Sequence, residues 1–96
     1  MTEAQQRDYD KLYKQMQDFG GKYDYKLIKK AFEYCVLKHD GQKRWTNEDY
    51  YIHPFNVALI IVSLGMDSES IAAALLHDVV EDTDVTVEDV KREFGD

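Results

Sequence analysis

With 96 residues, of which 44% are hydrophobic and 32% charged, the chain suits one domain, 1–96, with a modest core, and this mix excludes a disordered chain. Its only cysteine fits a reducing cytoplasm, no signal-peptide pattern opens the chain, and its longest uncharged run, 54–66, is too short for a membrane span of about 20 residues. The net charge of −7 is concentrated after residue 66, where 10 acidic residues accompany 2 basic ones, which excludes duplex nucleic acid as a partner.

Apolar residues recur at helical spacing along the chain, and no sustained alternation predicts a strand, so we expect an all-α fold. The first helix is predicted over 3–19 and ends at a pair of glycines, which favour non-helical backbone. The second runs from about Asp24 to 39–41, with Cys35 as a buried thiol on its apolar face and Gly41 as a left-handed cap.

The segment 42–52 has no helical period but carries aromatic residues, which predicts an ordered loop. Pro54 is expected at the first position of the third helix, where its missing N–H costs nothing, and Gly65 ends this helix. Four residues of the third helix are expected to face the core, namely Val57, Ile60, Ile61 and Leu64.

The fourth helix is expected to begin after Asp67 or Ser68, either of which can accept a hydrogen bond from its free N–H groups. Its run 71–76 is apolar nearly all round, so we expect this helix to be the most buried. A short fifth helix is predicted from Asp84 or Thr86 to the glycine near the end of the chain. These segments together predict an all-α bundle of about five helices.

The last turns of the fourth helix carry one imidazole and three carboxylates, those of His77, Asp78, Glu81 and Asp82. Residues four apart share a helix face, so Glu81 lies beside His77 and Asp82 lies beside Asp78. Three negative charges near a helix C-terminus oppose the helix dipole, so helix stability alone does not favour them. A bound divalent transition ion would explain the arrangement, whereas a salt-linked surface pair is the ordinary reading of an isolated His-Asp dipeptide.

His53 is a second candidate ligand, directly before Pro54. If the third and fourth helices pack antiparallel, His53 faces His77 and Asp78 across the groove between them. Capping of the third helix is the alternative role for this residue. His39, the third histidine, is expected to interact with the last carbonyls of the second helix and is not counted as a ligand.

Basic residues are scarce near these acids, so Lys43 and Arg44 in the loop are conspicuous. The planar guanidinium of Arg44 can stack on a base or bind a phosphate through two hydrogen bonds. Trp45 and Tyr50 can add a stacking or packing surface. Core packing is the expected role of Trp45, and solvent exposure is expected for Lys43.

Two stretches resemble a known family. Residues 39–54, HDGQKRWTNEDYYIHP, resemble the RelA/SpoT hydrolase pattern H-x-G-Q-x-R-x-[ST]-G-E-P-Y-x-x-H-P. Residues 73–83, AALLHDVVEDT, match its segment A-A-L-L-H-D-V-V-E-D-T throughout. The resemblance covers residues 27–96, and other His-Asp (HD) phosphohydrolases lack the long first stretch. The chain is therefore similar to the RelA/SpoT branch of these metal-dependent phosphohydrolases.

This resemblance implies an HD-type helical domain that removes the 3′-pyrophosphate of ppGpp or pppGpp with the aid of Mn²⁺, another divalent ion being the alternative. By matching position, His53, His77 and Asp78 would be metal ligands. Glu81 and Asp82 would orient or deprotonate the attacking water, as general-base chemistry requires.

The resemblance also implies that Arg44 contacts the guanine and that Thr46 and Tyr50 line the nucleotide site. The chain departs from the pattern at 47–49, which read Asn-Glu-Asp instead of G-E-P, and at Trp45, where lysine is usual. These departures leave the metal ligands unchanged but would alter how the loop receives the nucleotide.

The family's hydrolase domain is considerably longer, and its fourth metal ligand, an aspartate on a later helix, would lie beyond Asp96. We therefore expect a truncated, N-terminal portion of the domain, with weaker metal binding and little turnover if it stands alone. Two alternatives stay open. One is a non-catalytic HD domain that acts by partner binding or as a homo-oligomer, and the other is an HD phosphohydrolase for another nucleotide.

Overall fold

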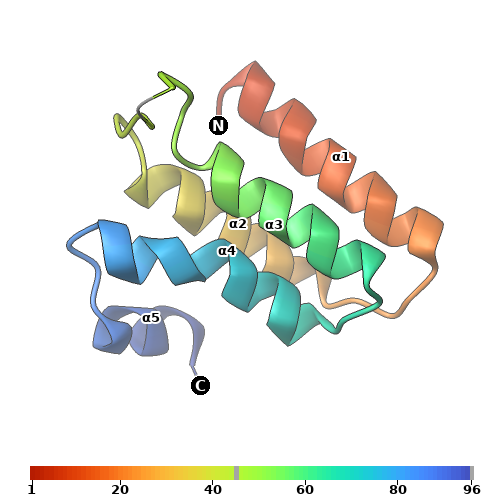
Figure 1. The fold of residues 1–96 in the computed structure, drawn as a ribbon. Coiled ribbons are helices and arrows are strands. Elements are labelled where there is room, and N and C mark those ends of the chain that lie inside the picture. Colours follow the sequence, from red (N-terminus) through yellow and green to blue (C-terminus); the bar gives the residue numbers. More distant parts are fainter. Residues whose placement is uncertain (45, 96) are drawn as a thin grey trace.

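The structure is a computed structural model and describes residues 1–44 and 46–95. Its regular structure there is helical (Figure 1), with no β-pairing beyond one isolated bridge between Lys43 and Asp49. The helices are α1 Glu3–Phe19, α2 Tyr25–Lys38, α3 Ile52–Ser63, α4 Ser68–Asp82 and α5 Val87–Phe94. The predicted all-α bundle of five helices is confirmed. None of the helices in these residues has the length and apolar character to cross a membrane.

The helices pack so that α4 lies along both α2 and α3, while α1 covers the other side of α3 (Figure 1). α3 and α4 run antiparallel, which brings the start of α3 beside the end of α4. The core is centred on Phe32, whose ring lies 5.5 Å from that of Tyr9 and 6.1 Å from that of Phe55. α5 is attached to α2 by Phe94, whose ring meets Tyr34 edge to face at 5.3 Å.

Side-chain caps set the helix starts. Thr2 and Gln5 form a capping box that begins α1, since each side chain accepts a hydrogen bond from the other residue's N–H. Asp67 caps α4 by accepting from the N–H of Ser70. Thr86 begins α5 through a second capping box, with Asp89. Of the predicted alternatives, Asp67 rather than Ser68 therefore caps α4, and Thr86 rather than Asp84 caps α5.

The start of α3 differs from the prediction. The helix begins at Ile52, two residues before Pro54, and the residue before it, Tyr51, already has helical backbone angles. The N–H groups of Ile52 and His53 donate to Asp49 and Tyr50 at 3.2 Å each. Pro54 still lies in the first turn, where a missing N–H leaves no intrahelical bond unmade. His53 is therefore a helical residue rather than a cap.

The buried face of α3 also differs from the prediction. Its buried residues are Pro54, Phe55, Ala58 and Val62. Ile60 and Leu64 are 57% and 67% exposed, and Val57 and Ile61 are half-buried. α3 is apolar nearly all round, so its own pattern could not select the face that meets α1 and α4.

The loop before α3 is an ordered hairpin, here defined as residues 42–44 and 46–50. The N–H of Tyr50 donates to the carbonyl of Gln42 at 3.1 Å, and the N–H of Arg44 donates to that of Glu48 at 2.9 Å. Asn47 adopts a left-handed φ of 71° at the tip. The ordered loop is thus confirmed, whereas the packing predicted for Trp45 lies outside the described residues.

Candidate metal centre

α4 separates its apolar and polar residues at its C-terminal end. Five apolar residues of α4 are buried, namely Ile71, Ala72, Leu75, Leu76 and Val79. The intervening positions carry His77, which is 68% exposed, and Asp78, which is only 15% exposed. This packing anchors the helix, so the imidazole and carboxylate are held on a rigid element rather than on a loop.

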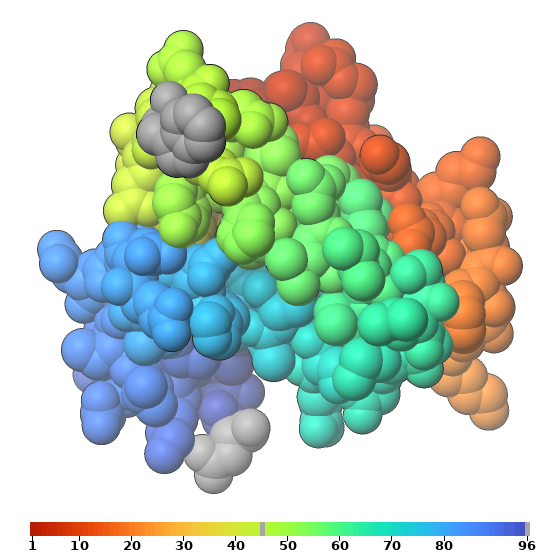
Figure 2. All heavy atoms as spheres, viewed as in Figure 1, coloured from red at the N-terminus to blue at the C-terminus, as the bar shows by residue number. Residues whose placement is uncertain are grey.

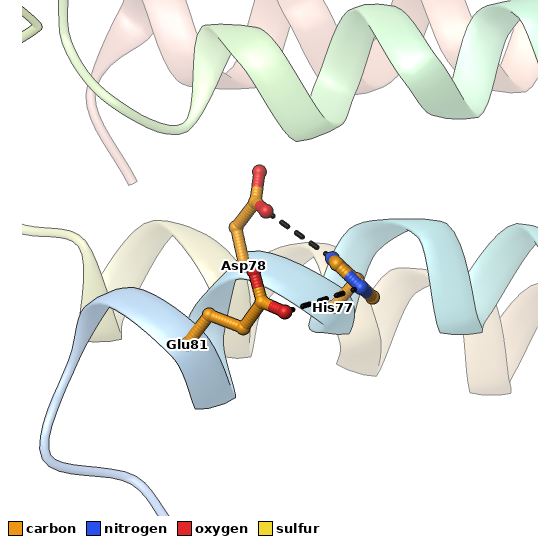
Figure 3. A group of neighbouring side chains, drawn as sticks. All are labelled: His77, Asp78 and Glu81. Atoms are coloured by element: carbon orange, nitrogen blue, oxygen red, sulfur yellow. Dashed lines mark hydrogen bonds and ion pairs between the residues drawn. The ribbon is translucent and has the colours of Figure 1, made fainter.

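His77, Asp78 and Glu81 form a group whose potential ligand atoms all lie within 4.8 Å of one another. Nδ1 of His77 lies 3.3 Å from Asp78 Oδ1, and Nε2 lies 3.7 Å from Glu81 Oε1. Figure 3 shows the imidazole beside the two carboxylates, with one ring nitrogen facing each of them and Asp78 pointing toward α3. Two ligands on opposite sides of an ion with bonds of about 2.1 Å lie about 4.2 Å apart. Each acid faces a different ring nitrogen of His77, and one ion can bind only one of these nitrogens, so the side chains would have to rotate to surround a single cation.

His53 joins this group from α3. Its Nε2 lies 3.5 Å from Oδ2 of Asp78, so the two carboxylate oxygens of Asp78 face two different histidines. The antiparallel packing of α3 and α4 produces this approach, as expected from the sequence. The structure thus brings His53, His77 and Asp78 together, and it adds Glu81 to their immediate surroundings.

The hairpin contacts the acidic end of α4. The hydroxyl of Tyr50 donates to Oδ2 of Asp82 at 2.6 Å, and this hydrogen bond is the main reason that the pKa of Tyr50 is raised to about 12. Partial burial and the negative charges of Asp82 and Asp78 raise this pKa further, whereas Arg44 lowers it. Figure 2 shows the yellow-green hairpin directly above the blue end of α4. Two residues with separately predicted roles, Tyr50 and Asp82, are therefore bonded to each other.

The other predicted nucleotide contacts differ in their placement. Arg44 is half-buried, and its positive charge lowers the pKa of Tyr50. Thr46 lies at the exposed tip, where its hydroxyl donates to Glu48 at 3.3 Å. Tyr50 therefore reaches α4 through its hydrogen bond to Asp82, whereas Thr46 is bonded within the hairpin.

Two buried residues do not enter the metal group. Cys35 is 1% exposed, and burial, together with the charge of Asp78, raises its pKa to about 12, so its thiol is protonated and inert at neutral pH. His39 is 3% exposed and contacts Gln42 rather than the metal group. Sequence reasoning missed Gln42 as a functional candidate, although the H-x-G-Q motif contains it.

Comparison with known proteins identifies the family. Residues 31–96 match the family model described as "HD domain". Over 69 residues, 72% of the chain, it is 56% identical to the guanosine-3′,5′-bis(diphosphate) 3′-pyrophosphohydrolase of Aquifex aeolicus, covering 10% of that protein. Its identity to the probable enzyme of the same name from Mycoplasma pneumoniae is 46%, again over 72% of the chain and 9% of that protein.

A third relative, the GTP pyrophosphokinase of Streptomyces coelicolor, is 45% identical over 72% of the chain and 8% of its own length. The chain thus spans about a tenth of the length of the curated relatives that it matches. Residues 31–96, which match the HD domain model, contain α3, α4 and the hairpin, and therefore every residue of the candidate metal centre. The chain belongs to the HD domain family, whose members depend on a metal ion.

Proposed function

We propose that residues 1–96 form one HD-type unit of a cytoplasmic, metal-dependent hydrolase that removes the 3′-pyrophosphate of ppGpp or pppGpp. The observation that carries this proposal is the convergence of His53 and Asp78 from two antiparallel helices, 3.5 Å apart, beside His77. The names of the most similar relatives support ppGpp as the substrate. The resemblance of the hairpin motif to the RelA/SpoT pattern supports the same class of nucleotide.

The donor set supports Mn²⁺ or a related divalent ion held by His53, His77 and Asp78. Imidazole nitrogen and carboxylate oxygen together suit first-row transition ions, and a purely carboxylate site would favour Mg²⁺ or Ca²⁺. When bound, such an ion polarises the phosphoryl oxygen and lowers the pKa of a water molecule. Glu81 lies close enough to His77 to serve as a further ligand or to fix the imidazole's orientation.

The two acids at the end of α4 suit different parts of the hydrolytic step. Oδ2 of Asp82 already accepts from Tyr50, which leaves Oδ1 to orient the attacking water by a hydrogen bond. Glu81 is 62% exposed, so its carboxylate is accessible to accept the water's proton. The water oxygen then bonds to phosphorus while the bond from phosphorus to the ribose 3′ oxygen breaks. The 3′ oxygen takes up a proton, from the protonated Glu81 or from solvent, to become a 3′-hydroxyl, and pyrophosphate is released.

The nucleotide would bind beside the hairpin. Arg44 offers a permanent positive charge and a planar surface for the guanine or a phosphate. Tyr50 and Thr46 would line the same site, with Tyr50 linking it to Asp82. The negative end of α4 repels phosphates, so the proposed ion and Arg44 are both needed to bring substrate to the acids.

Hydrolysis of ppGpp in the presence of Mn²⁺ tests the proposal. We expect slow release of pyrophosphate by the chain, in keeping with the little turnover expected of it alone, and we expect His77→Ala to abolish this release. Asp10→Asn is the control, because it alters an exposed polar side chain on α1 that is not part of the metal group. Equal rates for the chain and His77→Ala would refute the role of His77. A panel of pppGpp, GTP and other nucleotides then defines the substrate.

Self-association is a second candidate function, favoured by the apolar residues that α3 leaves exposed. Ile60 and Leu64 are four apart, so they share one face, and Phe19 lies beside the neighbouring Gly65. A copy of the chain could cover this face. Light scattering over a range of concentrations tests it, and Leu64→Lys should keep the chain monomeric.

A further inference from the structure

The buried imidazole of His39 has no part in the metal group, yet it is held in a defined position. Tyrosine and cysteine apart, it is the only buried polar or charged side chain among the described residues, with 3% exposed. Its Nδ1 lies 2.8 Å from Oε1 of Gln42, and its ring stacks on Tyr50 with centroids 4.8 Å apart. Its Nε2 is buried without a hydrogen-bond partner in the described residues. Burying an unpaired polar atom costs stability, so packing alone would favour an apolar ring here.

Gln42 uses both ends of its amide. Its Nε2 donates to the main-chain oxygen of Asp82 at 2.6 Å. A carbonyl oxygen can only accept, so the amide nitrogen faces Asp82 and the amide oxygen faces His39. That oxygen also only accepts, which places the imidazole proton of His39 on Nδ1. The result is a directional chain of hydrogen bonds from His39 through Gln42 to Asp82.

A second connection joins His39 to Asp82 through Tyr50. The phenol ring stacks on the imidazole at an angle of 26°, and its hydroxyl donates to Oδ2 of Asp82. The main chains of Tyr50 and Gln42 are also bonded to each other across the hairpin. Asp82 is therefore held at its carbonyl and at its carboxylate by two hairpin residues, and His39 supports both of them.

At the end of α4, the N–H and the hydroxyl of Thr83 both donate to the carbonyl of Val79, and Gln42 donates to that of Asp82. The last turn contains no basic residue, so no side chain of the helix itself neutralises its carbonyls. Without the hairpin, the carboxylate of Asp82 would be free to change rotamer in solvent. A group that orients a water molecule needs a defined position, and fixed hydrogen bonds supply it.

We propose that His39 and Gln42 are positioning residues, which hold Asp82 in the orientation needed to direct the attacking water. The inference rests on the proposed function for the role of Asp82. It adds two residues that contact neither the metal group nor the reacting atoms. Their proposed contribution acts through Asp82, which Gln42 reaches directly and His39 reaches through Gln42 and Tyr50.

A double-mutant cycle tests this dependence. Gln42→Met is similar in size to glutamine and removes both amide hydrogen bonds. We expect kcat for ppGpp to fall about tenfold, as for the loss of one or two hydrogen bonds, and Mn²⁺ affinity to change less than about twofold. In an Asp82→Ala background the same substitution should have no further effect on kcat. A further loss of the same size in that background would overturn the proposal.

Two other variants separate positioning from stability. Gln15→Met is the matched control, because Gln15 also donates from Nε2 to a main-chain oxygen, that of Leu59 at 2.7 Å. It should leave kcat unchanged. Gln42→Glu keeps an acceptor for His39 but cannot donate to Asp82, so it should reproduce the loss even if Gln42→Met folds poorly. His39→Asn, which retains a donor, should keep more activity than His39→Leu.

A measurement that does not depend on catalytic turnover can test the positioning role separately from the proposed hydrolase activity. The χ1 couplings of Asp82, measured by NMR on labelled protein, should report one rotamer in the unaltered chain and averaging in Gln42→Met. A single rotamer in both would overturn the positioning role. If Asp82→Ala leaves kcat unchanged, the catalytic role of Asp82 fails, and the couplings still decide whether Gln42 orients it.

Discussion

Nε2 of His53 lies 3.5 Å from Oδ2 of Asp78, and these two atoms connect the first turn of α3 with the last turns of α4. The other oxygen of Asp78 faces His77. Asp78 is thus the shared partner of two imidazoles, and its side chain is 15% exposed, the most buried of the three. A carboxylate that faces two imidazoles in this way supports the metal site proposed above.

Replacement of His53 should therefore weaken metal binding. We expect His53→Ala to lower Mn²⁺ affinity by about 100-fold or more, since loss of even an outer-shell partner costs 10–100-fold. Electron paramagnetic resonance of free Mn²⁺ measures this directly. Asp10→Asn serves as the control. An unchanged affinity in His53→Ala would assign the binding to the group of His77, Asp78 and Glu81 without His53.

The sequence was sufficient to predict that the residues of the candidate metal centre lie close together, because their arrangement obeys local rules. The spacing of His77, Asp78 and Glu81 is a property of any helix, and one tertiary assumption, antiparallel packing of two consecutive helices, placed His53 beside them. The roles of these residues in binding and catalysis stay predictions. Their proximity is what the structure establishes.

Other features depend on tertiary contacts that no local pattern encodes. The hydrogen bond from Gln42 to the carbonyl of Asp82 joins residues 40 positions apart. The buried face of α3 was predicted incorrectly because the helix offers apolar residues in every direction. Contacts with α1 and α4 bury Phe55, Ala58 and Val62 and leave Ile60 exposed.

The observed face of α3 predicts unequal effects of two truncations. Val62 is 0% exposed and Leu64 is 67% exposed. Val62→Ala should lower the free energy of unfolding by about 2 kcal/mol, from lost burial and the remaining cavity. Leu64→Ala should change it by less than about 0.5 kcal/mol. Urea denaturation of both variants measures the difference. A larger loss for Leu64→Ala would restore the face predicted from sequence, or reveal an interface that covers it.

The left-handed residue at the hairpin tip explains one departure from the RelA/SpoT pattern. Asn47 stands where the pattern has glycine, and its φ is 71°. Asparagine tolerates this conformation better than most residues, so the tip keeps its backbone without glycine.

Substitutions at Asn47 should follow this constraint. Asn47→Gly should leave the hairpin intact, whereas Asn47→Val should destabilise it by about 1–2 kcal/mol, because a β-branched residue is strained there. Amide hydrogen exchange at Tyr50 and Arg44, whose N–H groups close the hairpin, measures the local stability. Exchange should accelerate several-fold in Asn47→Val only. Equal protection in both variants would mean that other contacts determine the tip.

The buried thiol of Cys35 predicts a loss of stability at alkaline pH. Burial raises its pKa from 9.0 to about 12 in the folded chain, so between these values the unfolded chain loses a proton that the folded chain keeps. The contribution of this buried thiol to the free energy of unfolding is therefore fully present below pH 9. It is lost as the pH rises toward 12, by up to about 1.4 kcal/mol per pH unit. Tyrosines also titrate in this range, so the informative quantity is the difference between the unaltered chain and Cys35→Ala. Urea denaturation from pH 8 to 11 should show a shallower decline for Cys35→Ala. Parallel curves, or rapid labelling of the folded thiol at pH 8, would contradict a protonated and enclosed Cys35.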